Sequence, residues 1–244
     1  MRKNNITIEI FIRSIIFNLC FFITTLFIAF LGLFFAVWSK NLARIVGLLW
    51  GKSTLFLANY ICNITYNIQG ISKLPKHNKF IIASKHESTW DTAFFLAILN
   101  NPVYILKREL LFIPLFGLHL LFMGMIHINR SKGKKSVKEI TQKSDNVINN
   151  LARPIIIFPQ GTRTKPFEQK PYKSGIYAIA RNSKVNSYPV ILNSGQFWSK
   201  GSFFKYPGEI TVKIAKAVDH TLNKNIYMQE LEETIESKYI NLKK

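Results

Sequence analysis

The chain has 244 residues, 48% of them hydrophobic, and its 33 Lys and Arg against 13 Asp and Glu give a formal net charge of +20 at pH 7. This length suffices for one α/β domain with a sizeable core together with a membrane element. The positive surplus implies an anionic partner: a nucleic acid, an acidic membrane surface or a phosphorylated substrate. The sequence argues against nucleic acid, because it contains a membrane-length apolar segment and no finger, zipper or RNA-binding signature.

Residues 14–39 form a long apolar stretch without a single charged side chain. As a helix, this stretch would reach roughly 39 Å, which exceeds the roughly 30 Å of bilayer hydrocarbon. A cleavable signal peptide is disfavoured, because the stretch is too long and no clean small-x-small cleavage site follows it. We therefore predict a membrane anchor.

A second apolar run, residues 45–61, is interrupted by Lys52. It is either a second span or a helix lying in the interface, with Lys52 reaching the headgroups. Positive charges flank the first run on both sides, so charge counting leaves the orientation undecided. We prefer a helical hairpin that dips into one leaflet, because it places all these charges on one side. Residues 1–65 are thus predicted to be a membrane-anchoring helical segment and residues 66–244 an α/β domain.

After residue 66, short apolar runs begin to alternate with helical patterns. Residues 80–83 predict a buried strand that delivers His86 into the turn that follows. Ser88 and Asp91 resemble a capping box, which places His86 outside the next helix and Asp91 in its first turn.

The same alternation continues to the C-terminus. Residues 110–126 are apolar, but Pro114, Gly117 and Gly124 divide them into pieces too short to span a bilayer. We expect this segment to be a buried connector or a hydrophobic surface resting on the bilayer. Further helices are predicted at 136–151, 175–181 and 226–240, and further strands at 154–158, 190–192 and 210–215. Strands alternating with helices indicate an α/β layer fold.

The sequence offers no pattern for a disulfide framework or a metal site. Cys20 and Cys62 lie in apolar stretches, which is typical of buried thiols in a reducing compartment. His119 and His127 flank an apolar run without acidic or Cys neighbours. We therefore expect no metal.

His86 and Asp91 are the candidate catalytic pair. Imidazole has an unperturbed pKa of about 6.5, so it can accept a proton near neutrality. A carboxylate partner fixes its tautomer and stabilises the imidazolium that develops. Residues five apart on one helix point roughly 140° away from each other, so a productive contact requires His86 to lie outside the helix. The alternative is a surface His followed by an Asp that only stabilises the helix N-terminus.

Together with three later blocks, this pair resembles the 1-acylglycerol-3-phosphate acyltransferase family, whose motifs include His-x4-Asp and Phe-Pro-Glu-Gly-Thr-Arg. The resemblance makes His86 the general base and Asp91 its orienting partner. The later blocks match Lys107, Pro114, Gly117, Gly124 and Arg130, then residues 158–163, then Lys173 to Gly175 with Pro189-Val190. The resemblance covers about residues 66–215. It implies a mixed sheet flanked by helices, with an N-terminal membrane anchor.

The candidate substrate-binding residues lie in the later blocks. Arg130 and Arg163 are phosphate candidates, because guanidinium groups match phosphate oxygens bidentately. Outside the motifs, each would be interpreted as a solvated charge. Gly161 lets backbone N–H groups approach an anion without a Cβ in the way. Lys173 is a further phosphate candidate, and Gln160 and Thr162 complete the set.

Two departures from the family pattern bear on substrate choice. Gln160 stands where the family has Glu; its amide can still hydrogen-bond a glycerol hydroxyl, but it brings no negative charge. The second block ends in His127-Ile-Asn129-Arg130, where the family usually has Phe-x-Asp-Arg. We expect these changes to affect the substrate and not the reaction.

The resemblance implies acyl transfer to the sn-2 hydroxyl of lysophosphatidic acid, which gives phosphatidic acid. The co-substrate is an acyl thioester of acyl carrier protein or coenzyme A, and no other cofactor is expected. Direct transfer is favoured over an acyl-enzyme, because no Gly-x-Ser-x-Gly elbow occurs. The expected location is the bacterial inner membrane, with the site on the cytoplasmic side.

Several alternatives stay open. The acceptor could instead be glycerol 3-phosphate, another lysophospholipid or a lyso-aminolipid. A membrane-bound lipid hydrolase could use the same pair to activate water. A non-enzymatic protein that only binds anionic lipid would leave the ordered blocks unexplained.

Overall fold

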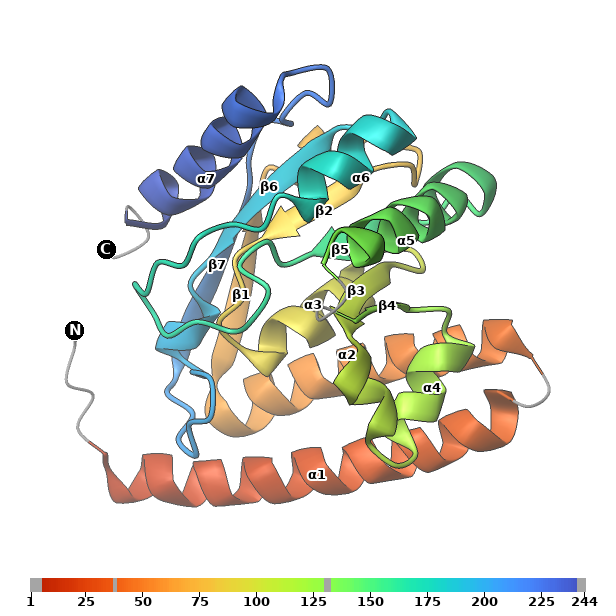
Figure 1. The fold of residues 1–244 in the computed structure, drawn as a ribbon. Coiled ribbons are helices and arrows are strands. Elements are labelled where there is room, and N and C mark those ends of the chain that lie inside the picture. Colours follow the sequence, from red (N-terminus) through yellow and green to blue (C-terminus); the bar gives the residue numbers. More distant parts are fainter. Residues whose placement is uncertain (1–5, 37–38, 130–132, 241–244) are drawn as a thin grey trace.

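Two long helices form a pair on one side of the molecule in the computed structural model, which describes residues 6–36, 39–129 and 133–240 (Figure 1). The helices α1 (Ile8–Ala36) and α2 (Lys40–Cys62) run antiparallel. Ser39 caps α2, since its hydroxyl accepts a hydrogen bond from the backbone N–H of Asn41 at 3.2 Å. By length and composition alone, both helices could cross a membrane.

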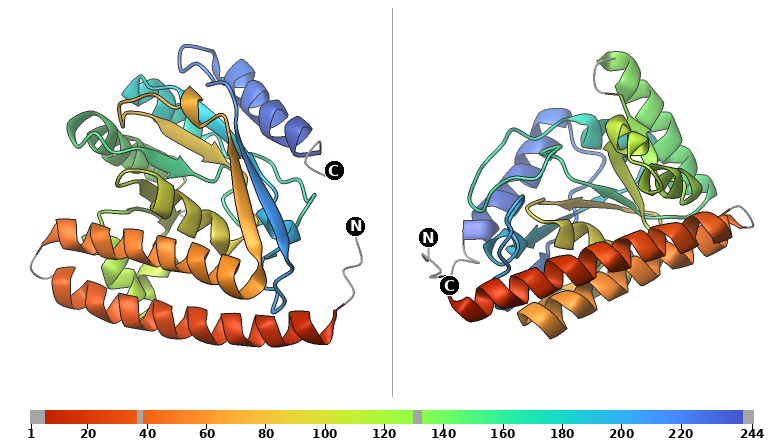
Figure 2. Two further views of the ribbon diagram at one scale, coloured as in Figure 1. Left: turned by 180° about the vertical axis from the view of Figure 1, so that it is seen from behind. Right: turned by 90° about the horizontal axis from the view of Figure 1, so that it is seen from below.

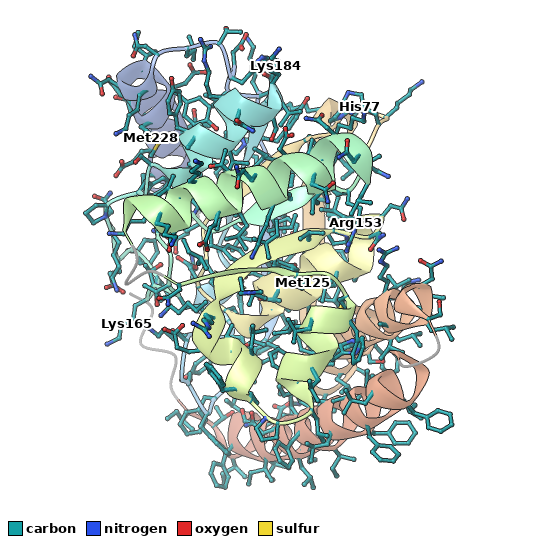
Figure 3. All side chains as sticks on the ribbon, turned by 45° about the vertical axis from the view of Figure 1, so that its right-hand side comes forward. His77, Met125, Arg153, Lys165, Lys184 and Met228 are labelled. Carbon is teal, nitrogen blue, oxygen red and sulfur yellow. The ribbon has the colours of Figure 1, made fainter. Side chains whose placement is uncertain are left out.

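Large apolar side chains cover the outer side of this helix pair. Phe22 and Phe30 of α1 are 61% and 63% exposed, and Phe56 of α2 is 63% exposed. Side chains along the outer side of the pair project away from the rest of the molecule (Figure 3). An apolar surface of this kind is typical of a site that contacts lipid or another protein.

Polar contacts fasten α1 to the rest of the molecule. The backbone N–H of Lys205 donates to Ser14 Oγ at 3.0 Å, and Lys205 Nζ donates to Asn18 Oδ1 at 3.1 Å. Asn18 Nδ2 in turn donates to the carbonyl oxygen of Phe203 at 3.0 Å. The helix pair therefore packs directly on the α/β domain. The first strand begins at Ile64, so the boundary predicted after residue 65 falls inside that strand.

Seven strands form one mixed sheet within the described residues. In chain order they are β1 (Ile64–Gln69), β2 (Ile81–Ser84), β3 (Val103–Lys107), β4 (Ile126–Ile128), β5 (Ile155–Ile157), β6 (Ser187–Leu192) and β7 (Gly208–Ile214). Their order across the sheet is β1-β7-β6-β2-β5-β3-β4, and every neighbouring pair is parallel except β6 and β7. The carboxyl ends of β2, β3, β4, β5 and β6 therefore meet at one edge.

Helices cover both faces of the sheet (Figures 1 and 2). On one face lie α5 (Lys134–Asp145), α6 (Gly175–Ser183) and α7 (Lys224–Ile240); on the other lies α3 (Thr89–Ile98), with α2 packed against it. A Cβ added at Gly51 of α2 would lie 2.7 Å from the carbonyl oxygen of Ala93, so glycine permits this close approach. Trp90 and Phe94 of α3 are buried in the core, where burial of aromatic rings contributes strongly to stability.

The predicted α/β layer fold is confirmed, and the predicted elements lie within a few residues of the observed ones. The helix predicted at 136–151 is an α-helix that ends at Asp145 and continues as a π-helical turn, Asn146–Asn150. The strands β1, β3 and β4 were not predicted from the sequence. The strands β3 and β4 border the long apolar segment 110–126. Where nearly every residue is apolar, the alternation of apolar and polar residues that identifies a strand cannot be seen.

That apolar segment forms a hydrophobic surface beside the helix pair. It contains part of a 3₁₀ turn (Arg108–Phe112) and the short helix α4 (Phe116–Phe122), which contacts α1 and α2. Phe112 is 73% exposed and Leu118 is 51% exposed. Other residues of the segment are buried, among them Leu120, Met123 and Met125, so both expected features are present: an exposed apolar surface and a buried part. The contact of this surface with a bilayer stays a prediction.

Candidate active site

The candidate site lies where the five mutually parallel strands end. His86 follows β2, Phe158 follows β5, Lys107 ends β3 and Ser194 follows β6. In open α/β sheets, ligands bind outside the carboxyl ends of the strands. The strand order therefore gathers four distant parts of the chain at one place.

His86 and Asp91 make the contact that the sequence predicts. His86 Nδ1 lies 3.0 Å from Asp91 Oδ2. Ser88 is the N-cap of α3, and both hydrogen bonds of the capping box are present, so His86 lies outside the helix as expected. When Nδ1 donates to the carboxylate, Nε2 is left as a hydrogen-bond acceptor. The contact is confirmed, and its catalytic role stays a prediction.

Asp91 is fully buried and accepts hydrogen bonds from four donors. Besides His86, its Oδ2 accepts from the backbone N–H groups of Glu87 at 2.8 Å and Ser88 at 2.9 Å. Ser194 Oγ donates to the other oxygen, Oδ1, at 2.5 Å. These donors fix the carboxylate, which can then orient the His86 ring and stabilise an imidazolium.

The His86 ring is packed against an aromatic neighbour. It stacks on Phe158, with ring centroids 3.8 Å apart and ring planes 13° apart. Burial lowers the pKa of His86 below its usual 6.5, the hydrogen bond to Asp91 opposes this shift, and the charges of Arg163 and Lys200 add to it. This direction favours the neutral imidazole, which is the form that a general base needs.

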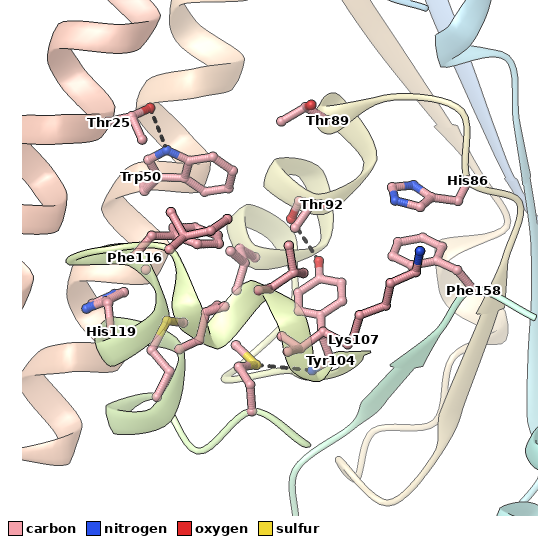
Figure 4. Close-up of a pocket in the computed structure, with 18 of the residues that line it drawn as sticks. Thr25, Trp50, His86, Thr89, Thr92, Tyr104, Lys107, Phe116, His119 and Phe158 are labelled. Carbon is pink, nitrogen blue, oxygen red and sulfur yellow. Dashed lines mark hydrogen bonds between the residues drawn. The ribbon is translucent and has the colours of Figure 1, made fainter. Parts of the chain in front are cut away.

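A cavity of about 680 Å³ extends from His86 to the helix pair (Figure 4). Near His86 its wall contains the cationic side chains Lys107, Arg163 and Lys200. Farther in, its wall is apolar and comes from several helices, with Phe21, Ile28, Trp50, Leu96, Phe116 and Met123. The cavity thus joins a cationic end to an apolar end.

The three cations are held around the polar end of the cavity. Arg163 Nη1 donates to Thr89 Oγ1 at 2.8 Å. Lys200 Nζ donates to the carbonyl oxygen of Arg163 at 3.1 Å. Lys107 reaches toward His86 and Phe158 from the end of β3 (Figure 4). Guanidinium and ammonium groups in this arrangement suit an anionic group such as a phosphate.

Part of the predicted binding set lines the cavity. Gly161, Thr162 and Arg163 are in its wall. Arg130 lies outside the described residues, so its predicted role stays a prediction.

Gln160 and Lys173 lie elsewhere. Gln160 is buried but does not line the cavity; its Nε2 lies 3.5 Å from Glu236 Oε1. Lys173 is exposed and does not line the cavity, and its backbone N–H donates to the carbonyl oxygen of Pro159 at 2.8 Å. These positions argue against direct contact between either side chain and a molecule in the cavity.

Three residues of the site region were not predicted from the sequence: Ser194, Lys200 and Glu87. Glu87 is fully buried, its Oε2 accepts from the backbone N–H of Gly195 at 3.1 Å, and burial raises its pKa to about 8. A usable signal existed for Ser194, because a strand predicted at 190–192 ends just before it. Only the order of strands in the sheet could have shown that this strand lies beside β2.

The mixed α/β fold places a His–Asp pair beside three cationic side chains at one end of an apolar cavity. Within the described ranges, no group of three or more His, Cys, Asp or Glu could hold a metal ion.

Residues 65–193, more than half of the chain, match the family model described as Acyltransferase. The chain therefore belongs to the acyltransferase family.

Individual relatives agree with this assignment. The chain is 34% identical over 169 residues to a 1-acyl-sn-glycerol-3-phosphate acyltransferase of Pseudomonas aeruginosa, a match that covers 69% of this chain and 65% of that protein. It is 28% identical over 167 residues to 1-acyl-sn-glycerol-3-phosphate acyltransferase alpha of Mus musculus, covering 67% and 58%. The chain thus matches less than two thirds of the length of these curated relatives.

A solved structure shares the fold. The crystal structure of the 1-acyl-sn-glycerophosphate acyltransferase PlsC from Thermotoga maritima superposes with a TM-score of 0.77 at 22% sequence identity. The superposition covers 95% of this chain and 97% of that one. At this identity the likeness shows the mixed α/β fold alone.

Proposed function

We propose that this protein transfers a fatty acyl group from a thioester to the sn-2 hydroxyl of lysophosphatidic acid, giving phosphatidic acid for phospholipid synthesis. The observation that carries this proposal is the partly buried His86–Asp91 pair, which opens onto a cavity that is cationic at one end and apolar at the other. A lysophospholipid has the matching chemistry, with a phosphate and a fatty acyl chain on one glycerol.

In this mechanism the His86–Asp91 pair activates the acceptor. His86 Nε2 takes the proton of the sn-2 hydroxyl while its oxygen attacks the thioester carbonyl carbon. Asp91 stabilises the imidazolium that forms. The tetrahedral intermediate collapses, the carbon–sulfur bond breaks, and the departing thiolate takes the proton from His86. The products are an ester and a free thiol, and the enzyme returns to its starting state.

The cationic end of the cavity is suited to the phosphate. Arg163 offers guanidinium donors, and Lys107 and Lys200 add two positive charges within the same wall. Gly161 permits backbone N–H groups to approach an anion, as the sequence suggests. We include Arg130 in this set on the resemblance alone.

The apolar end and the helix pair are suited to acyl chains and to a bilayer. Apolar side chains of α1, α2 and α4 line the deep part of the cavity, so a chain bound there is shielded from water. The exposed Phe and Leu side chains of α1 lie on the opposite side of the same helix pair. We infer that the pair lies in one leaflet of the bacterial inner membrane and opens the cavity toward it, with the site facing the cytoplasm. Acyl carrier protein and coenzyme A are both anionic donors compatible with the basic surface, and no further cofactor is invoked.

Mass spectrometry of products tests the proposal. Purified protein in detergent is incubated with lysophosphatidic acid and either acyl-coenzyme A or acyl carrier protein loaded with a fatty acyl group. We expect phosphatidic acid and a stoichiometric amount of free thiol. His86→Ala should lower turnover by at least roughly 10³-fold while the thermal unfolding transition is retained. Release of free fatty acid without phosphatidic acid would show that the protein is a hydrolase. Retained turnover in His86→Ala would show that His86 is not the general base.

A further inference from the structure

A buried ion pair connects the C-terminal helix to the residue immediately before His86. Lys85 is fully buried, and its Nζ lies 2.7 Å from Glu236 Oε2 on α7. The same Nζ lies 4.3 Å from the ring centroid of Tyr239, also on α7. A buried charge without a partner is very costly, so Lys85 needs the carboxylate that α7 supplies.

The other oxygen of Glu236 contacts the loop that follows β5. Glu236 Oε1 accepts a hydrogen bond from the Tyr172 hydroxyl at 2.9 Å and from Gln160 Nε2 at 3.5 Å. One carboxylate therefore joins two loops of the active site: the loop with Lys85 and His86, and the loop with Gln160 and Arg163.

This contact gives a physical reason for an amide at position 160. An amide can donate to Glu236, whereas a carboxylate cannot donate when ionised. A Glu at position 160 would place a second negative charge about 3.5 Å from the first, with a single buried ammonium to neutralise both. The Glu-to-Gln departure in this motif therefore matches the presence of Glu236.

We propose that Glu236 is a positioning residue, which acts with Lys85 and Gln160 to hold the His86 loop and the Arg163 loop in register. Gln160 then acts through Glu236 and not on the substrate. This inference rests on the proposed acyl transfer. It also assigns a role to α7, which lies outside residues 65–193, the part of the chain that matches the family model.

The spacing of the cluster along the chain explains why it would affect the reaction. Lys85 is directly bonded to His86, and Gln160 lies between Phe158, which stacks on the His86 ring, and Arg163, which lines the cationic end. A shift of about 1 Å between reacting groups can cost roughly 10²-fold in rate. Loosening one carboxylate would thus separate the base from the phosphate site.

A charge-exchange series tests the proposal. The variants are Gln160→Glu, Glu236→Gln and the double variant Gln160→Glu/Glu236→Gln, with Glu230→Gln as the matched control. Glu230 is an exposed carboxylate on the same helix. Turnover is measured well below the lowest melting temperature, so that every variant is folded during the assay.

We expect each single variant to lose roughly 10²-fold in kcat while KM for lysophosphatidic acid changes less than about threefold. Glu236→Gln leaves Lys85 unpaired, and Gln160→Glu crowds two carboxylates. The double variant again has one carboxylate and one amide beside Lys85, so its kcat should recover to within about tenfold of wild type. Glu230→Gln should equal wild type.

Thermal unfolding gives a readout that does not depend on activity. Both single variants should melt roughly 5 °C or more below wild type, and the double variant should melt closer to wild type than either. A double variant slower than both singles would overturn the proposal. Unchanged kcat in the folded single variants would show that Gln160 and Glu236 stabilise the fold without positioning the active site. A raised KM in Gln160→Glu with unchanged kcat would show that Gln160 contacts the substrate. If the wild-type protein transfers no acyl group but the double variant regains the melting temperature, the proposed function is wrong and the contact between Gln160 and Glu236 is still supported.

Discussion

The two ends of the cavity are built in different ways. The cationic end consists of loops that follow parallel strands and is held by buried hydrogen bonds, such as the four donors around Asp91. The apolar end consists of helices whose lining side chains are mainly apolar and are held mainly by packing, although Trp50 Nε1 donates to Thr25 Oγ1 there at 3.0 Å. Hydrogen bonds fix groups in particular orientations, whereas apolar packing fixes mainly volume. Changes at the two ends should therefore have separable effects on rate and on acyl-chain choice.

The largest effect is expected at the directional end, from Asp91→Asn. The amide is nearly the same size but cannot support the imidazolium or hold the same tautomer, so kcat should fall roughly 10³-fold or more. Steady-state kinetics at saturating substrates measure this. The thermal unfolding transition should persist, since Asn is also a good helix-capping partner. A fall of less than about tenfold would mean that Asp91 has only a capping role.

A smaller effect at the same end is expected from Arg163→Ala. Loss of charge-assisted hydrogen bonds to the phosphate should raise KM for lysophosphatidic acid roughly 10- to 100-fold. Transfer to a monoacylglycerol, which has no phosphate, should change little and serves as the internal comparison. Lys165→Ala removes an exposed charge in the same loop and should leave both acceptors unaffected. Equal losses on both acceptors would place Arg163 outside phosphate recognition.

At the apolar end we expect a change in selectivity with the rate preserved. Ala29 of α1 is 8% exposed and lines the cavity, so Ala29→Phe should fill part of it. Competition between thioesters of different length should then favour shorter chains by roughly tenfold or more, because the pocket rejects extra methylenes. Leu26→Phe places the same phenyl ring on the exposed side of the same helix and should leave the preference unchanged. An unchanged preference in Ala29→Phe would show that acyl chains bind elsewhere.

The smallest effect concerns the pH dependence of stability. The pKa of Glu87 is raised by burial from 4.5 to about 8, so the folded protein retains a proton that the unfolded chain loses within this window. The contribution of Glu87 to the stability of the folded protein therefore falls as pH rises from 4.5 to about 8. Glu87→Gln should remove this contribution, so its melting temperature should rise relative to that of the wild type as pH increases across this range, measured by calorimetry. Glu209→Gln, which removes an exposed carboxyl, is the control. Equal slopes in wild type and Glu87→Gln would show that Glu87 is ionised in the folded protein.

Local sequence patterns predict much of the site. The capping box at Ser88 and Asp91 depends on residues three apart, and it suffices to place His86 outside α3. The strand before His86 and the strand before Phe158 are visible as short buried runs. The placement of Gly161, Thr162 and Arg163 in the cavity follows the motif that contains them.

Local patterns fail where a residue depends on its spatial neighbours. Gln160 belongs to the same motif, yet its side chain is buried beside Glu236 and not in the cavity. Ser14 and Asn18 read as part of an uncharged apolar helix, but both make polar contacts with Lys205. No periodicity within one segment contains information about such partners.

By itself, the sequence determined the α/β class, the two long apolar helices, the His86–Asp91 contact and the glycine turn that leads to Arg163. These depend on hydrogen bonds and periodicities within a few residues. The tertiary structure decided that β5 lies between β2 and β3, that Ser194 reaches Asp91, and that Glu236 neutralises a lysine 151 positions earlier in the chain. The reason is physical: strand order and buried charge pairing minimise the free energy of the whole chain, so their partners are set by packing across the sheet and not by spacing along the sequence.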